Sequence, residues 1–258
     1  MYTWLSPLAE LRLAVAFALA PTIRAILSNP RLLFHPSLLS TLFFTHVWAA
    51  FADGVDSNSR DTKRLLITPH ASGHVLDIGA GYGHTLQYLD HPKIVRYIAL
   101  EPNSLMHPRI RSAANAAGYS EDNGSLLILS CGAEDTDHIL SATGSQLDTL
   151  ISVLTLCTVP APQQTIAAMT DRLLKPGGQL LFYEHVLNPQ PDIAWWQRFW
   201  TPIWALAFDG CRLDRPTDVW IEQTDGWARG QAWDKTGEPA DHLFRHRYGR
   251  YEKAGVSD

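Results

Sequence analysis

Short apolar runs alternate with helical segments from His74 onward, and this is the dominant pattern of the chain. Continuous apolar strands separated by helices are typical of a parallel sheet that is covered on both faces. The pattern also predicts two closing strands near residues 227–233 and 243–251. We therefore predict an α/β fold. The five apolar runs are His74–Ile78, Tyr97–Leu100, Leu126–Leu129, Leu147–Leu154 and Gln179–Tyr183.

The first ~70 residues have a different, helical pattern. Apolar residues recur at helical spacing from Leu8 to Ile23 and form an amphipathic helix. A second apolar stretch covers Leu38–Phe51, and the polar segment Asp53–Arg60 predicts a turn before another short helix. We expect two domains: an N-terminal helical lobe over 1–70, acting as a lid or a membrane-surface segment, and a ligand-binding domain over 71–258.

The first strand runs directly into a glycine-rich loop, Gly79-Ala80-Gly81-Tyr82-Gly83. Glycines let a backbone turn tightly and approach a ligand. A dinucleotide fingerprint needs a further glycine where His84 stands, and no triphosphate-binding loop is present. The spacing suits a cofactor without a pyrophosphate, such as S-adenosylmethionine. Glu101 ends the second strand, 22 residues after Gly79, where a carboxylate accepts hydrogen bonds from a ribose diol.

From Val75 to Tyr183 the chain resembles the class I S-adenosylmethionine-dependent methyltransferases. VLDIGAGYG looks like their first motif, Glu101 like their ribose-binding acid and LLKPGGQLLF like the segment that enters the fifth strand. The resemblance implies a Rossmann-like, seven-stranded methyltransferase sheet, with S-adenosyl-L-homocysteine as the second product. The residues expected to bind the cofactor are Asp77, Gly79, Ala80, Gly81, Tyr82, Glu101, Pro102, Asn103, Ala133, Glu134, Ser152 and Leu154.

A narrower resemblance, to the methyltransferase-like thiol S-methyltransferases, is carried by TLCTV at Thr155–Val159, EHV at Glu184–Val186 and the stretch Trp196–Leu213 with its FDGC element. That family methylates small alkyl thiols, and its animal members carry an N-terminal membrane anchor. Here the N-terminal segment is shorter and is interrupted by Pro21. The resemblance implies methylation of sulfur, while oxygen stays open because pocket details decide the acceptor.

His185 is the predicted catalytic base, because it follows the fifth strand at the ligand-binding edge and imidazole has a suitable pKa. Asp209 in FDGC is the second predicted catalytic residue, orienting a base or assisting an acceptor proton. Aromatic residues recur every four positions from Trp196 to Phe208, so Trp200 and Trp204 are expected in the acceptor pocket, with His46 from the lobe.

Composition narrows the partners. A net charge of -5 argues against nucleic acid and favours a small, rather apolar acceptor. The three cysteines have no zinc-like spacing, so no metal is expected. We expect a cytoplasmic protein with reduced thiols. Peripheral contact with an intracellular membrane through the N-terminal helix is the alternative. Two other functions stay open: a non-methylating isomerase or cyclase on this fold, and a catalytically silent cofactor-binding protein.

Overall fold

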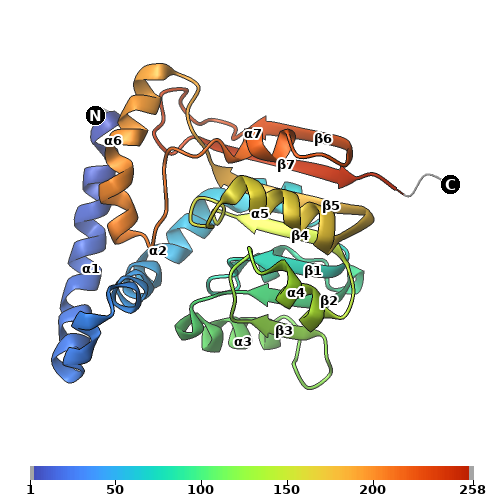
Figure 1. The fold of residues 1–258 in the computed structure, drawn as a ribbon, viewed down its shortest axis with the longest axis horizontal. Coiled ribbons are helices and arrows are strands. Elements are labelled where there is room, and N and C mark those ends of the chain that lie inside the picture. Colours follow the sequence, from blue (N-terminus) through green and yellow to red (C-terminus); the bar gives the residue numbers. More distant parts are fainter. Residues whose placement is uncertain (1–2, 256–258) are drawn as a thin grey trace.

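The protein is described here by a computed structural model that covers residues 3–255 (Figure 1). Its centre is a seven-stranded sheet in the order β3-β2-β1-β4-β5-β7-β6. Strands β1 to β5 pair in parallel, whereas β7 runs antiparallel to both β5 and β6. This confirms the predicted α/β class. The strands are β1 Gly73–Ile78, β2 Ile94–Leu100, β3 Leu126–Leu129, β4 Leu147–Val153, β5 Leu174–His185, β6 Trp227–Asp234 and β7 His246–Lys253.

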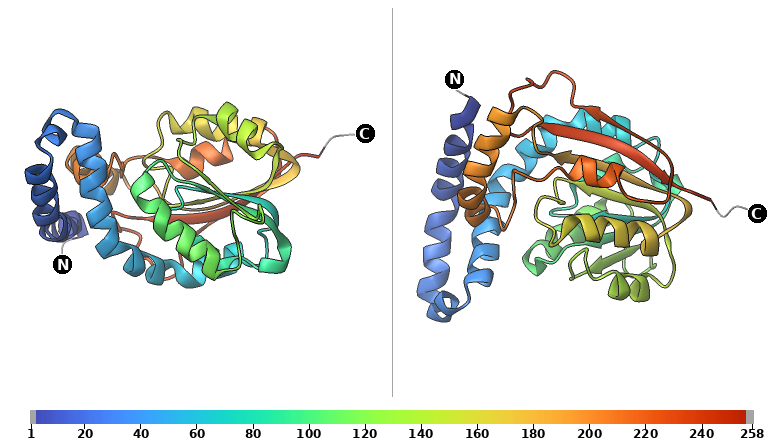
Figure 2. Two further views of the ribbon diagram at one scale, coloured as in Figure 1. Left: turned by 90° about the horizontal axis from the view of Figure 1, so that it is seen from below. Right: turned by 45° about the horizontal axis from the view of Figure 1, so that its top comes forward.

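Helices cover both faces of the sheet, as Figure 2 shows. Alternate residues of β1 explain why both faces need cover: Val75 packs into one buried apolar cluster, while Leu76 and Ile78 pack into the other. The first cluster contains residues of α3 and the end of α2, and the second contains residues of α4, α5 and α7. These helices are α3 His107–Ala116, α4 Thr136–Thr143, α5 Pro162–Ala168 and α7 Thr217–Glu222.

The N-terminal lobe consists of α1 Ser6–Ser28 and α2 Pro36–Ile67, and α6 Pro191–Ala207 packs against it (Figure 1). Helix α2 does not stop at the lobe, because Leu66 and Ile67 near its end are buried in the core beneath the sheet. The division of the chain at residue 70 stays a prediction. In the structure, one helix belongs to both parts and fixes their orientation.

The turn predicted at Asp53–Arg60 was wrong, because these residues continue α2 without a break. One polar residue of the segment, Asp56, belongs to a buried hydrogen-bond cluster. The Asp56 carboxylate is buried and accepts from Lys63 Nζ and, at 2.8 Å, from Tyr88 Oη. Lys63 is itself 3% exposed. Asp56 and Ser59 therefore face the protein interior, while the other polar residues of this segment are exposed.

Two smaller features also differ from the prediction. The glycine loop leads into a short 3₁₀ helix, His84–Tyr88, instead of an α-helix. Gly177 and Gly178 lie inside β5, which begins at Leu174. In both places the glycines mark a local change of backbone direction, and the boundaries around them were not readable from composition.

We predict that Asp56→Ala lowers the free energy of unfolding by about 3–5 kcal/mol, because it leaves the Lys63 ammonium buried without its counter-ion. Urea titration followed by circular dichroism measures the change. Asp61→Ala, an exposed position on the same helix, serves as the control and is expected to stay within about 0.5 kcal/mol of the parent protein. Equal losses in the two variants would contradict the structural role of the buried pair.

Candidate active site

A cavity of about 420 Å³ opens at the carboxyl ends of β1, β2 and β4, which is where open α/β sheets bind ligands. Helix α2 of the lobe closes one side with Thr41, Phe44 and Trp48. The sheet side includes eight of the residues predicted to bind a cofactor. They are Gly79, Gly81, Glu101, Pro102, Asn103, Ala133, Glu134 and Leu154.

The glycine loop forms the floor of this first cavity. Gly79 has φ of 66°, and a Cβ there would stand 2.4 Å from Thr155 Oγ1. Gly81 has φ of 57°, and its Cβ would stand 2.9 Å from Trp48 Nε1. Both the left-handed backbone and the close neighbours exclude larger residues. The absence of side chains at these two positions thus lets Thr155 and Trp48 pack directly on the loop beside the cavity.

Glu101 connects the loop to the next strand. Its two carboxylate oxygens accept hydrogen bonds from the backbone N–H of Gly81 and of Asn103, each at 2.9 Å. A carboxylate has about four lone-pair sites, so each oxygen can accept a further bond from the cavity. Burial raises the pKa of Glu101 to about 7, against the opposing effect of these two N–H donors. The two N–H groups thus hold the carboxylate in a position where it can accept hydrogen bonds from a diol.

Four other residues predicted to bind a cofactor do not line the first cavity in the described part of the chain. Asp77 is buried within β1, where it accepts from Tyr97 Oη at 2.6 Å. Ser152 Oγ donates to Glu184, and Tyr82 Oη donates to the Thr45 carbonyl at 3.3 Å. Ala80 lies in the glycine loop, with its N–H donating to the Leu100 carbonyl. These contacts support the walls of the cavity.

A second cavity, of about 340 Å³, adjoins the first and shares Phe44, Trp48, Leu154 and Thr158 with it. Its lining is aromatic and rich in histidine and cysteine, so it suits a small apolar molecule with one reactive group. The residues that belong to this cavity alone include Cys157, Tyr183, His185, Trp204, Phe208, Cys211, His242 and His246.

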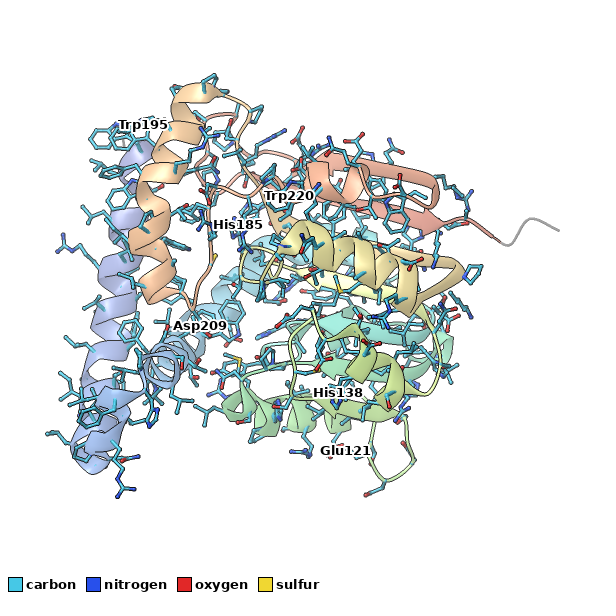
Figure 3. All side chains as sticks on the ribbon, in the orientation of Figure 1. Glu121, His138, His185, Trp195, Asp209 and Trp220 are labelled. Atoms are coloured by element: carbon cyan, nitrogen blue, oxygen red, sulfur yellow. The ribbon has the colours of Figure 1, made fainter. Side chains whose placement is uncertain are left out.

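His185 ends β5 and faces the second cavity (Figure 3). The ring is 6% exposed, and its Nε2 lies 3.3 Å from Cys211 Sγ. Cys211 Sγ in turn lies 3.2 Å from Cys157 Sγ. The predicted base is therefore surrounded by two thiols.

Asp209 lies at the end of α6 near α2 and lines the first cavity instead (Figure 3). Its Oδ1 accepts from Ser40 Oγ at 3.2 Å and from Thr41 Oγ1 at 3.5 Å. Burial raises the pKa of its carboxyl, although these hydroxyls oppose the rise. Asp209 and His185 therefore line different cavities, and Asp209 attaches the segment after α6 to the lobe.

Of the three residues predicted for an acceptor pocket, only Trp204 lines a cavity; its ring stacks on Phe208 with centroids 3.8 Å apart. Trp200 donates its indole N–H to the Trp4 carbonyl at 2.8 Å, which ties α6 to the start of the lobe. Within residues 3–255, neither Trp200 nor His46 lines either cavity. The aromatic stripe of α6 is mostly helix packing.

Trp48, Cys157 and Cys211 line the site but were not predicted from the sequence. Trp48 lies in an apolar stretch with no motif, so nothing local marks it. The cysteines lie within TLCTV and FDGC, the two segments that carried the narrower resemblance. The presence of one cysteine in each of these two segments was the available signal that the two cysteines belong to one site.

Comparison with known proteins agrees with this geometry. The methyltransferase domain family matches residues 51–219. The human thiol S-methyltransferase TMT1B is 31% identical over 183 residues, covering 68% of this chain and 71% of that protein. The rat TMT1B is 30% identical over 151 residues. The alignment with the rat protein spans 58% of each chain, and that with human TMT1A spans 57% of each.

Solved structures share the fold at lower identity. An O-methyltransferase family protein from Burkholderia thailandensis has a TM-score of 0.59 at 16% identity, over 83% of this chain and 61% of the other. The [4+2]-cyclase SpnF has a TM-score of 0.53 at 13% identity, over 77% and 80%. These two likenesses concern the fold alone.

The extent of the domain match, the human relative and the arrangement of strands lead to one assignment. This chain belongs to the class I S-adenosylmethionine-dependent methyltransferases, as a relative of the thiol S-methyltransferases.

Proposed function

We propose that the protein transfers a methyl group from S-adenosylmethionine to the sulfur of a small, rather apolar thiol. The observation that carries this proposal is the pair of adjoining cavities. One has the polar and glycine-rich lining that a nucleoside needs, and the other has an apolar lining around His185. Their common wall of Phe44, Trp48, Leu154 and Thr158 is where donor and acceptor would meet.

S-adenosylmethionine supplies a methyl group that is already activated on a sulfonium sulfur. In this proposal Glu101 accepts hydrogen bonds from the ribose hydroxyls. Gly79 and Gly81 face the amino acid part of the cofactor, and Ala133 and Glu134 border its adenine. The residues fit the group, because Gly79, Gly81 and Glu101 line one cavity and each Glu101 oxygen can accept a further hydrogen bond. The protein's own tasks are alignment and exclusion of water.

Sulfur is favoured over oxygen as the acceptor atom for two reasons. The relatives at about 30% identity are thiol S-methyltransferases. In addition, a thiol has a pKa near 8.5 and is partly ionised at neutral pH, whereas a phenol with a pKa near 10 needs a well-placed base. Among the described residues that line the second cavity, Glu10 is the only one with a carboxylate.

Location in the cell is the second part of the proposal. Helices α1 and α2 are each long and apolar enough to cross a membrane, and only 22% and 11% of their most apolar windows are buried. The large side chains that α1 exposes favour the peripheral alternative over a purely cytoplasmic protein. They are Leu8, Leu13, Val15, Phe17, Leu19, Ile23 and Leu27.

We expect the purified protein to convert small alkyl thiols to methyl thioethers, with S-adenosylhomocysteine formed in equal amount, and to leave matched phenols unmethylated. Mass spectrometry of both products measures this. His185→Ala is expected to lower turnover at least tenfold while cofactor affinity stays near that of the parent protein. A substrate-derived product of unchanged mass, without S-adenosylhomocysteine, would point to an isomerase or cyclase. Tight cofactor binding without any turnover would indicate a silent binding protein.

A second prediction concerns the pH dependence of cofactor binding. The Glu101 pKa of about 7 means that the free protein carries a proton on this carboxyl below neutrality. Binding a diol to the carboxylate then requires proton release, so the Kd for S-adenosylmethionine should rise up to about tenfold per pH unit below 7 and level off above it. Titration calorimetry between pH 5.5 and 8.5 measures this slope.

Glu101→Gln should bind about 10- to 100-fold more weakly at pH 8 through loss of charged hydrogen bonds. Its Kd should also lose the part of the slope that Glu101 causes, because titration of the cofactor itself remains in the variant. Glu121→Gln, at an exposed position, should keep the parent profile. Identical slopes in the parent and Glu101→Gln would refute the role of this carboxyl.

A third prediction tests the membrane contact. The protein should co-float with anionic phospholipid vesicles, and a double change of Leu13 and Phe17 to Ser should reduce the bound fraction at least fivefold, since about 0.8 kcal/mol is lost per buried methylene group. Changing exposed Val95 and Leu105, which lie on the sheet domain away from α1, to Ser provides the control. Equal flotation of all three proteins would refute the contact through α1, and no flotation of the parent protein would favour the cytoplasmic assignment.

A further inference from the structure

We propose that Cys157, His185 and Cys211 form a binding site for a zinc ion, whose open position receives the sulfur of the acceptor. The acceptor in this inference rests on the proposed function, whereas the binding of zinc does not. The three candidate ligand atoms all lie within 4.8 Å of one another. They come from the loop after β4, the end of β5 and the loop after α6.

The distances among the three side chains are those of a ligand set. Cys211 Sγ lies 3.2 Å from Cys157 Sγ and 3.3 Å from His185 Nε2. Around zinc, with metal–sulfur bonds of about 2.3 Å and a metal–nitrogen bond of about 2.0 Å, tetrahedral ligands are separated by about 3.5–3.8 Å. These two pairs would therefore need to separate by about half an ångström or less to reach that geometry, and the third pair lies within 4.8 Å. Two thiols and one imidazole are also donors that zinc prefers.

The loops that carry these residues are held in place by hydrogen bonds that do not involve the candidate ligand atoms. The Arg215 guanidinium donates from Nη1 to the carbonyls of Leu156 and Val159, at 2.8 and 2.7 Å, on either side of Cys157. The backbone N–H of Arg212 donates to the Cys157 carbonyl at 3.1 Å, which fastens the Cys211 loop to the Cys157 loop. The frame is thus built before any ion binds.

Burial distinguishes this cluster from a chance surface grouping. Cys157 is 2% exposed and His185 is 6% exposed. Cys211 is partly exposed toward the cavity, and its sulfur lies next to both the Cys157 sulfur and the His185 Nε2. A shared cation gives the Nε2 and both sulfur atoms a common partner in a pocket of low polarity.

The open side of the cluster faces the second cavity, which all three residues line. Three protein ligands with one free position are the arrangement of a catalytic zinc site, whereas structural sites use four protein ligands. A thiol R–SH would enter this position, its S–H proton leaving to water as the sulfur–metal bond forms. The metal-bound sulfur then forms a bond to the donor methyl carbon, and the electron pair of the broken carbon–sulfur bond stays on the donor sulfur. The neutral thioether leaves.

The nearby trio of Glu238, His242 and His246 does not provide the same site. Glu238 Oε1 lies 2.7 Å from His246 Nδ1 and 3.4 Å from His242 Nδ1, and its other oxygen accepts from the His246 backbone N–H. This carboxylate thus already has two histidine rings and a backbone N–H as neighbours. The trio also contains no thiol, which makes it the matched control.

Zinc content tests the inference without substrate or cofactor. Protein produced with added zinc and purified without chelator should contain about one zinc per chain by plasma mass spectrometry. Cys157→Ser, Cys211→Ser and His185→Ala should each lower this content at least fivefold. Cys131→Ser, the third cysteine, and Glu238→Gln should retain it. Calorimetric binding of S-adenosylmethionine by every variant verifies that the chain is folded.

Cobalt provides an independent readout. Apoprotein reduced and loaded with Co²⁺ should show a near-ultraviolet thiolate-to-cobalt absorption band, which Cys131→Ser keeps and Cys157→Ser weakens. Absence of both zinc and this band in reduced, cofactor-binding protein would overturn the inference, as would a Cys157–Cys211 disulfide that persists in the isolated protein. Thiol methylation by metal-free protein would refute the zinc site alone, whereas bound zinc without thiol methylation would refute only the proposed function.

Discussion

The buried carboxylate of Glu184 fixes the loop on which both cavities depend. Its Oε1 accepts from Ser152 Oγ at 2.7 Å and from the backbone N–H groups of Thr155 and Leu156 at 3.0 and 3.3 Å. Burial raises the pKa of this carboxyl, and these three donors oppose the rise by favouring the charged form. One side chain thereby sets the path of the chain after β4, and it stands directly before His185 on β5.

The lobe completes what the sheet begins. The sheet and its loops supply the glycine turn, Glu101 and the end of β5, but Phe44 and Trp48 from α2 close both cavities. The hydroxyls of Ser40 and Thr41 hold Asp209, so the element after α6 is attached to α2 on the side of the cofactor. Because the far end of α2 is buried beneath the sheet, the lobe cannot move as a separate lid without disturbing that core.

The sequence predicted the parts of the fold that local patterns encode. Apolar strands, the glycine loop and the position of Glu101 depend on residues close in the chain, and each was readable. Asp53–Arg60 was misread because its polar composition resembles that of a turn, whereas Asp56 has a buried partner, Tyr88, about thirty residues away. The cluster of Cys157, His185 and Cys211 was equally unreadable, since its members are 26 to 54 residues apart and no spacing rule covers them.

Leu154 connects the hydrogen bonds around Glu184 to the wall that the two cavities share. Among residues 3–255 it is one of three residues other than glycine with positive φ, at 55°, a conformation that costs a leucine on the order of 1 kcal/mol or more. Its N–H donates to the Tyr183 carbonyl at 2.8 Å, and the next two N–H groups are held by Glu184. The hydrogen bonds to β5 therefore maintain the strain. The result is that one residue lines both cavities and Cys157 follows three positions later, on the acceptor side. If Leu154 adopted a negative φ, the loop would lose this shared wall, and the two cavities would no longer adjoin at this residue.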